Sequence, residues 1–275
     1  MTKTLKIIFI FILLPSSVFA AKTCSIFIHG YTPTSESYFG ELPRQVHWDS
    51  SKNIEVASLE VAKGILEKMD TCEDGDLITL RPHSYGAAQV FYILGLGKRF
   101  QAKYPNHDFV KVYKKTFEVF SFTGAYHGTA LMNLVCSNFL TKTIGDRFGK
   151  SCVESLLTST LSGATDYVNS PGVPTYLIHS TNRSGYLGTT GGIIAKFGVS
   201  FWDYYIKGVR DQNDNTLPIS ATRGCANQET MKNENDNCKK IDSNFLIDFF
   251  HEKESNHTEF LDDADFMYMG SIDEK

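Results

Sequence analysis

Short apolar runs and longer segments with helical spacing alternate along this chain. In residues 54–69 the apolar side chains recur every three or four positions, as on one face of an α-helix, and residues 85–100 also read as a helix. Apolar runs of strand length lie at residues 25–28, 44–48, 117–122, 174–178 and 245–250, and another starts at Leu77. This alternation predicts an α/β fold with a mostly parallel central sheet flanked by helices, whose chemistry lies beyond the carboxyl ends of the strands.

Ser84 stands at the break between the run that starts at Leu77 and the predicted helix at 85–100. A strand, a sharp turn and a helix expose the hydroxyl of a serine at the turn, as in a nucleophile elbow. Gly86 supplies the small residue that such an elbow needs, because helix and strand approach closely there. Pro82 departs from the usual Gly-x-Ser-x-Gly pattern, since proline fixes φ and lacks an N–H. The context makes Ser84 the candidate nucleophile.

Residues 1–20 have the layout of a cleaved secretory signal, with Lys3 and Lys6, an apolar run at 7–14, and then small and polar residues. We therefore expect an exported mature chain of residues 21–275. No stretch approaches the roughly 20 apolar residues that a transmembrane helix needs, so we expect no membrane anchor. Loss of the two lysines lowers the net charge from −4 to −6, and an acidic chain argues against a nucleic-acid partner.

All six cysteines lie in the expected mature chain, at positions 24, 72, 136, 152, 225 and 238. An even number in an exported chain predicts disulfides, although six cysteines allow 15 pairings. There is no Cys-x-x-Cys motif, and the eight histidines lack the paired spacing of a zinc site. We therefore expect no metal and no cofactor.

No internal repeat, low-complexity tract or Pro/Gly/Ser-rich linker interrupts residues 21–275, which predicts a single domain. Two segments, 131–166 and the Gly-rich 185–202, are longer than crossovers require. Each is either a set of ordinary packing helices or a cap over an apolar site, and 131–166 is the stronger candidate for a cap or lid.

A nucleophilic serine needs a base within hydrogen-bond reach and an acid that orients this base. In proteins with this elbow the three residues follow in the order Ser, acid, His. We predict His257 as the base, because it lies in a polar loop after the last predicted strand, with His251 at the end of that strand as the alternative. The candidate acid is Asp214, in a polar turn before an apolar stretch, and Asp211 competes with it.

The tetrahedral intermediate of acyl transfer needs two N–H donors aimed at its oxyanion. We predict that these are the backbone N–H of Tyr85, directly after the nucleophile, and that of Tyr31, in the loop that leaves the first strand. His29, His83 and His127 lie near these elements, and we interpret them as braces of their loops.

The order of these motifs resembles the α/β-hydrolase superfamily, and within it the bacterial secreted lipases and esterases. The resemblance spans nearly the whole mature chain and rests on residues 27–30 as the oxyanion strand end, 82–86 as the elbow, 124–129 as a Gly-x-Pro-His-x-Gly-Ser/Thr stretch, 214–220 as an Asp-Gly-x-Val-x-x-Ser stretch, and 256–257 as an Asn-His pair. Departures are Pro82 and Asn215 for Gly, and Tyr126 for Pro. Some of these lipases hold calcium with an acid two residues after the catalytic histidine, where this chain has Glu259, but no partner ligand is identified.

The resemblance implies a secreted serine hydrolase that cleaves lipid or other apolar acyl esters through an acyl-enzyme, in transient contact with a lipid surface. An acyltransferase or a thioesterase would use the same triad, and a non-catalytic binding protein on a hydrolase scaffold is a further alternative.

Local spacing favours disulfides between Cys136 and Cys152 and between Cys225 and Cys238. Cys24 and Cys72 then remain. If their strands are neighbours in the sheet, as the resemblance implies, both thiols lie at the same end and can meet.

Overall fold

The computed structural model describes residues 23–31, 39–73, 77–126, 128, 136, 172–180, 246–247 and 252–253. The expected leader at 1–20, the segment 185–202 and, apart from Cys136, the segment 131–166 lie outside these residues. Within the described part, no helix has both the length and the apolar character needed to cross a membrane.

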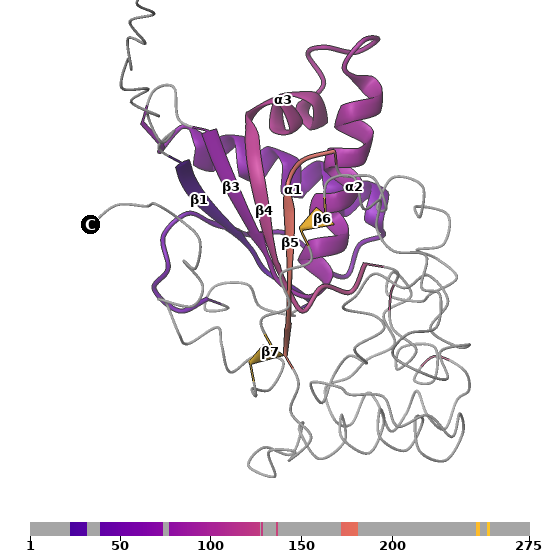
Figure 1. The fold of residues 1–275 in the computed structure, drawn as a ribbon. Helices are drawn as coiled ribbons and strands as arrows, with labels where there is room; N and C mark the ends of the chain where they lie inside the picture. The colour runs from indigo at the N-terminus through magenta and orange to yellow at the C-terminus, as the bar shows by residue number, and fades with distance from the viewer. Residues whose placement is uncertain are drawn as a thin grey trace, which may run out of the picture.

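The described chain alternates between strands and helices, as the sequence predicts (Figure 1). The helices are α1 (Ile54–Met69), α2 (Tyr85–Phe100) and α3 (Asp108–Lys115). The strands are β1 (Thr23–Ile28), β2 (Gln45–Val46), β3 (Leu77–Pro82), β4 (Thr116–Phe122), β5 (Thr175–Ser180), β6 (Leu246–Ile247) and β7 (Glu252–Lys253). The predicted bounds of α1 and α2 are confirmed. β1 starts two residues before the predicted strand, β2 is shorter than 44–48, and the apolar pattern predicts neither α3 nor β7.

All described strand pairs are parallel, in the order β2-β1-β3-β4-β5-β6, with β7 beside β5. β1 pairs with β3 over its whole length, and Ile28 lies opposite Pro82 at the carboxyl end. The chain leaves β1 toward β2 on one side and leaves β3 toward β4 on the other. In open α/β sheets such a reversal marks the place where ligands bind, outside the carboxyl ends of the strands.

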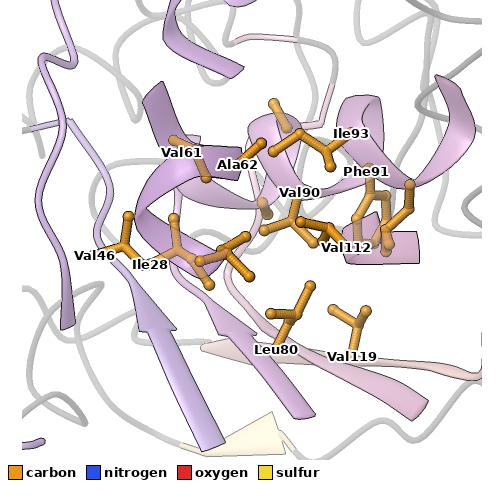
Figure 2. Close-up of a cluster of buried hydrophobic side chains, with 14 of the residues drawn as sticks. Ile28, Val46, Val61, Ala62, Leu80, Val90, Phe91, Ile93, Val112 and Val119 are labelled. Carbon is orange, nitrogen blue, oxygen red and sulfur yellow. The ribbon is translucent and has the colours of Figure 1, made fainter. Parts of the chain in front are cut away.

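The main core lies between one face of the sheet and the three helices (Figures 1 and 2). Five strands contribute to it, through Leu177 of β5 and through Ile28, Val46, Leu80 and Val119. The last four lie opposite Val61 and Ala62 of α1, Val90, Phe91 and Ile93 of α2, and Val112 of α3. Each Val, Leu, Ile or Phe side chain that is fully buried in this way contributes about 1.5–3 kcal/mol. Side chains alternate along a strand, and the other face therefore carries a second cluster of Phe27, Phe39, Phe120, Phe122 and Ile178.

Arg81 lies in β3, three residues before Ser84, and its side chain is fully buried. Its Nε donates a hydrogen bond to the Ser25 hydroxyl oxygen at 3.0 Å, and its guanidinium carbon lies 4.7 Å from the centre of the Phe120 ring. Such partners are needed because a buried charge costs several kcal/mol in lost hydration. The strand that carries Ser84 is thus held to both neighbouring strands by a side chain as well as by its backbone.

A disulfide joins Cys24 of β1 to Cys72, which lies between α1 and β3, with the Cα atoms 5.9 Å apart. This pair confirms the one that the resemblance implies. Cys136 is also disulfide-bonded. The predicted pairs with Cys152 and between Cys225 and Cys238 stay predictions.

We expect the double variant Cys24→Ala/Cys72→Ala to be less stable than the native protein by about 4 kcal/mol. The bond joins residues 48 positions apart, and loop closure of this length in the unfolded chain accounts for a loss of that size. Urea unfolding followed by circular dichroism measures the difference. A loss below about 1 kcal/mol would show that the disulfide constrains the unfolded chain far less than its span suggests.

Candidate active site

Ser84 lies at the turn between β3 and α2, with φ 52° and ψ −121°. These angles belong to the second residue of a type II′ turn, a position that normally takes Gly. The Gly86 N–H donates to the His83 carbonyl oxygen at 2.9 Å and closes this turn. A non-Gly residue in such a conformation costs about 1–3 kcal/mol and persists only where its surroundings hold it. The strand-turn-helix context predicted for Ser84 is therefore present, in a strained form.

Backbone hydrogen bonds hold the elbow from both neighbouring strands. The His83 N–H donates to the Ile28 carbonyl of β1, and the Ser84 N–H donates to the Phe122 carbonyl of β4, each at 3.0 Å. The Ser84 carbonyl in turn accepts from the Ala125 N–H, in the loop after β4, at 3.0 Å. The N–H and the C=O of Ser84 therefore both bind the β4 side of the elbow, and these hydrogen bonds hold the strained conformation. Ser84 is 9% exposed.

Gly86 and Pro82 both fit this geometry. A Cβ on Gly86 would lie 2.5 Å from the His29 carbonyl oxygen and 2.7 Å from that of Ile28, so the first turn of α2 packs directly on the end of β1. The regular pairing of β3 with β4 ends at Leu80 and resumes only at a bridge between His83 and Phe122. The missing N–H of Pro82 falls in this interruption, where a sheet tolerates proline.

The departure at Tyr126 also has a structural basis. Its side chain is fully buried, its ring stacks on that of Phe91 with 4.7 Å between centres, and its hydroxyl donates to the Ser121 Oγ at 2.5 Å. Burial raises the pKa of this phenol well above its ordinary value. Tyr126 is therefore a core residue that packs beneath the loop after β4.

The two predicted oxyanion donors lie on elements that meet beside Ser84. Tyr85 is the first residue of α2, where N–H groups point along the helix axis out of its N-terminal end. Tyr31 follows β1 in the loop 29–31, and its half-buried side chain packs against the main core. The close approach of Gly86 to His29 brings this loop next to the elbow.

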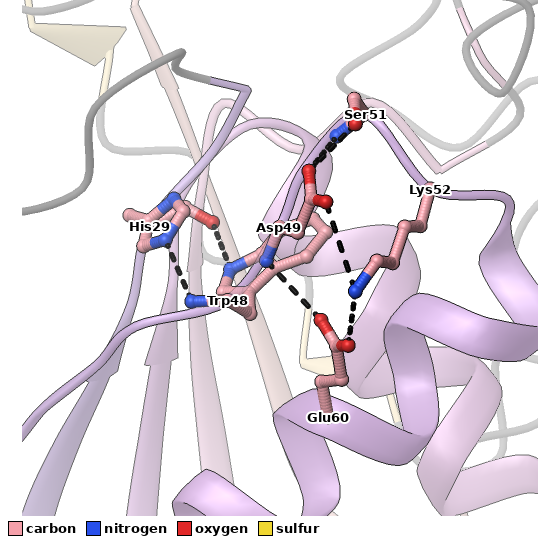
Figure 3. A network of polar contacts seen from close by, with 6 residues as sticks. All are labelled: His29, Trp48, Asp49, Ser51, Lys52 and Glu60. Carbon is pink, nitrogen blue, oxygen red and sulfur yellow. Dashed lines mark hydrogen bonds and ion pairs between the residues drawn. The ribbon is translucent and has the colours of Figure 1, made fainter.

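His29 is buried behind this loop and braces it, in line with the interpretation from the sequence (Figure 3). Its Nδ1 lies 2.6 Å from the Gly30 carbonyl oxygen, and its Nε2 accepts from the Trp48 backbone N–H at 3.3 Å. The Trp48 indole N–H donates to the His29 carbonyl oxygen at 3.3 Å, and the two rings stack with centres 5.1 Å apart. The sequence pattern does not predict this role of Trp48, whose one signal is that it is an aromatic residue at the end of the predicted strand 44–48.

We expect His29 to make the protein less stable in acid. Burial, and then the nearby His47, lower the pKa of His29 from 6.5 to about 4, because both disfavour the imidazolium. Between these pH values the unfolded chain binds a proton that the folded chain does not. Stability is therefore unaffected above pH 6.5, falls as the pH drops toward 4, and loses in total about 3 kcal/mol. Urea unfolding at pH 7.5 and 4.5 should show this loss in the native protein and less of it in His29→Asn, and equal losses would contradict the assignment.

Asp214 and His257, with their alternatives Asp211 and His251, lie outside the described residues, so their roles stay predictions. Among the residues that the structure describes, no group of three or more His, Cys, Asp or Glu side chains is arranged to hold a metal ion. The expectation of no metal and no cofactor likewise remains an expectation for the chain as a whole.

The sequence matches no known protein family and no curated protein. Solved structures do match. The mature form of the Bacillus licheniformis lipase BlEst2 superposes with a TM-score of 0.57 at 15% identity, over 91% of both chains. Its propeptide form has a TM-score of 0.58 at 15% identity, over 93% of this chain and 52% of that one. The phospholipase PlaB of Legionella pneumophila is less similar, with a TM-score of 0.46 at 14% identity, over 74% of this chain and 46% of the other. The likeness to the Bacillus structures shows the fold: this chain has the architecture of the α/β-hydrolases.

Proposed function

We propose that this chain is an exported serine hydrolase that cleaves carboxylic esters of lipids or other apolar acyl compounds. The observation that carries the proposal is Ser84, a non-Gly residue held at φ 52° in the turn between β3 and α2. Backbone strain of this kind clusters at active sites. The similar fold of a bacterial lipase supports ester hydrolysis. The leader pattern at 1–20 and the disulfide of Cys24 with Cys72 support export, since disulfides persist in oxidising compartments.

In the proposed first half-reaction the Ser84 Oγ attacks the ester carbonyl carbon while His257 takes the hydroxyl proton. The carbonyl oxygen becomes an oxyanion that accepts from the backbone N–H groups of Tyr31 and Tyr85. The bond from carbon to the alcohol oxygen then breaks, and His257 returns the proton to the leaving alkoxide. Asp214 orients the imidazole and stabilises its charged form.

In the second half-reaction water attacks the acyl group on Ser84. His257 takes a proton from this water and gives it to the Ser84 Oγ as the acyl bond breaks, which releases the carboxylic acid and restores the hydroxyl. An acyltransferase would differ only in the group that replaces water. Product analysis of a p-nitrophenyl ester, with the free acid as the expected product, separates the two.

A fluorophosphonate probe tests the nucleophile directly. The probe phosphonylates an activated serine, and peptide mapping should place the label on Ser84. The matched control is Ser121→Ala, which removes a buried serine of the neighbouring strand β4 and should leave labelling intact. A label on any other serine, or no label on the folded protein, would overturn the proposed function.

The acyl preference is tested by kcat/KM over p-nitrophenyl esters with acyl chains of two to eight carbons. If the segment 131–166 shields an apolar acyl site, each buried methylene adds up to about 0.8 kcal/mol, and kcat/KM should rise steeply before it levels off. A steady fall from acetate onward would instead indicate a small-ester esterase or a deacetylase.

A further inference from the structure

The two ring nitrogens of His29 have opposite roles. Nδ1 lies 2.6 Å from the Gly30 carbonyl oxygen, which only accepts hydrogen bonds, so Nδ1 carries the hydrogen. Nε2 lies 3.3 Å from the backbone nitrogen of Trp48, which only donates, so Nε2 is the acceptor. The two contacts together select a single neutral tautomer of the imidazole.

This tautomer fixes the direction of one predicted oxyanion donor. The Gly30 C=O and the Tyr31 N–H belong to the same planar trans peptide unit and point in opposite directions. Gly30 alone would allow this unit to rotate, because glycine has wide access to φ and ψ. The hydrogen bond from His29 to the Gly30 carbonyl removes that freedom, and it turns the Tyr31 N–H away from the imidazole ring.

Trp48 connects this donor to the other one. Its ring lies against the imidazole of His29 on one side, and against the ring of Tyr85 with 5.5 Å between centres. Its backbone N–H and its indole N–H bind the Nε2 and the carbonyl oxygen of His29. One largely buried side chain, in a loop that contains neither donor, therefore touches the elements that carry both.

The loop after β2 that carries Trp48 is itself tied to α1 (Figure 3). Asp49 accepts from the backbone N–H of Ser51 at 3.0 Å, and its own N–H donates to the Glu60 carboxylate at 3.3 Å. Lys52 binds the Glu60 carboxylate and lies 3.7 Å from that of Asp49. The Tyr85 hydroxyl reaches the Lys52 carbonyl oxygen at 3.5 Å. Each exposed contact is weak alone, but together they limit the positions that Trp48 can take.

We propose that His29 and Trp48 form the positioning unit of the oxyanion hole, fixing the Gly30–Tyr31 peptide by hydrogen bonds and Tyr85 by ring packing. The inference rests on the proposed function. Neither side chain touches the substrate; both act through backbone donors that bind the oxyanion. Because that oxyanion forms only as the reaction proceeds, misplaced donors lower kcat and leave KM nearly unchanged.

The test compares kcat and KM for a p-nitrophenyl ester in the native protein, His29→Leu and His29→Asn. Leucine removes both hydrogen bonds of the ring, and kcat should fall about 100-fold with KM within threefold of the native value. The Asn side-chain amide can still donate to the Gly30 carbonyl, so His29→Asn should keep kcat within about tenfold. The Ki of a trifluoromethyl ketone, whose serine adduct carries the same oxyanion, should rise in parallel with the loss in kcat/KM.

The matched control is His107→Leu. His107 also accepts from a backbone N–H, that of Phe109 at 3.2 Å, but it caps α3 ahead of the amino end of β4, away from the elbow. Its removal should lower stability and leave kcat unchanged. Trp48→Leu provides a second test at the site, with the same selective fall in kcat expected, and it decides the matter if His29→Leu does not fold.

The outcomes separate this inference from the proposed function. Absence of fluorophosphonate labelling at Ser84 in the native protein would overturn the proposed function. Native labelling and turnover, with kcat unchanged in a folded His29→Leu or Trp48→Leu, would overturn the positioning role alone. A rise in KM that accounts for the whole loss of kcat/KM would also overturn it, because that pattern reports lost substrate binding.

Discussion

Ser84→Ala and Ser84→Gly should each lower kcat for ester hydrolysis by about 10⁴-fold or more. Both variants remove the only protein group that the proposed mechanism makes a nucleophile, and loss of one member of such a triad removes most of its catalytic effect. Hydrolysis of a p-nitrophenyl ester measures the loss, and circular dichroism checks that both variants are folded. Turnover above about 1% of the native value in a folded variant would place the nucleophile elsewhere.

The same two variants should differ in stability, in the reverse of the usual order. Glycine in place of alanine ordinarily destabilises a protein by about 0.5–1 kcal/mol, through the entropy of the unfolded chain. At φ 52° and ψ −121°, however, alanine carries strain of about 1–3 kcal/mol that glycine does not. Urea unfolding should therefore find Ser84→Gly more stable than Ser84→Ala by about 1 kcal/mol. A less stable glycine variant would mean that the elbow is not strained.

His257→Ala should cost about as much kcat as Ser84→Ala, whereas His251→Ala should retain most of the activity. The described histidines that the structure accounts for are otherwise engaged: His29 uses both ring nitrogens on backbone groups, and His107 caps α3. These two histidines are therefore not the base that takes the proton of Ser84, in keeping with the prediction of a base in the later part of the chain. Only in His257→Ala should the pH dependence of kcat/KM lose its limb near neutrality.

If His251→Ala instead loses activity and His257→Ala retains it, the base is His251, at the end of the last predicted strand. Added imidazole gives a further check, because it can diffuse into the space left by a missing histidine. It should restore part of the activity of His257→Ala and none of that of Ser84→Ala.

The helices flanking the elbow are predicted to the residue because several local signals agree there. In α1 the apolar spacing begins directly after Asn53, whose side chain accepts from the Val56 N–H as an N-cap. In α2 the start follows from Ser84 and Gly86, which break the preceding strand. Local interactions are sufficient to predict the boundaries of these two helices, without any tertiary contact.

The short helix α3 is not predicted by such local signals. Its eight residues include Phe109, Val110, Val112 and Tyr113, which favour strands, and its N-cap is His107, an unusual choice for that position. What keeps it helical is the packing of Phe109 and Val112 on the core under α2. Tertiary contact outweighs the local preference for a strand here, and this contact cannot be predicted from the sequence alone.

The same distinction between local features and tertiary contacts applies to the residues of the candidate site. Ser84 and the two loops beside it follow from strand ends, which are local features. The contact of His29 with Trp48 joins residues 19 positions apart across two strands and depends on β2 lying next to β1. The sequence spacing of these two residues does not predict their contact.

The disulfide of Cys24 fastens β1 at its amino end, whereas Ser84 lies beyond the carboxyl end of the neighbouring strand. Cys24 lies four positions, or about 13 Å of strand, before Ile28, where the elbow is attached. Breaking the bond should therefore leave the turnover of folded molecules intact while they unfold sooner. In the exported enzyme that we propose, beyond the reach of chaperones, this bond would govern how long each molecule keeps working rather than how fast it works.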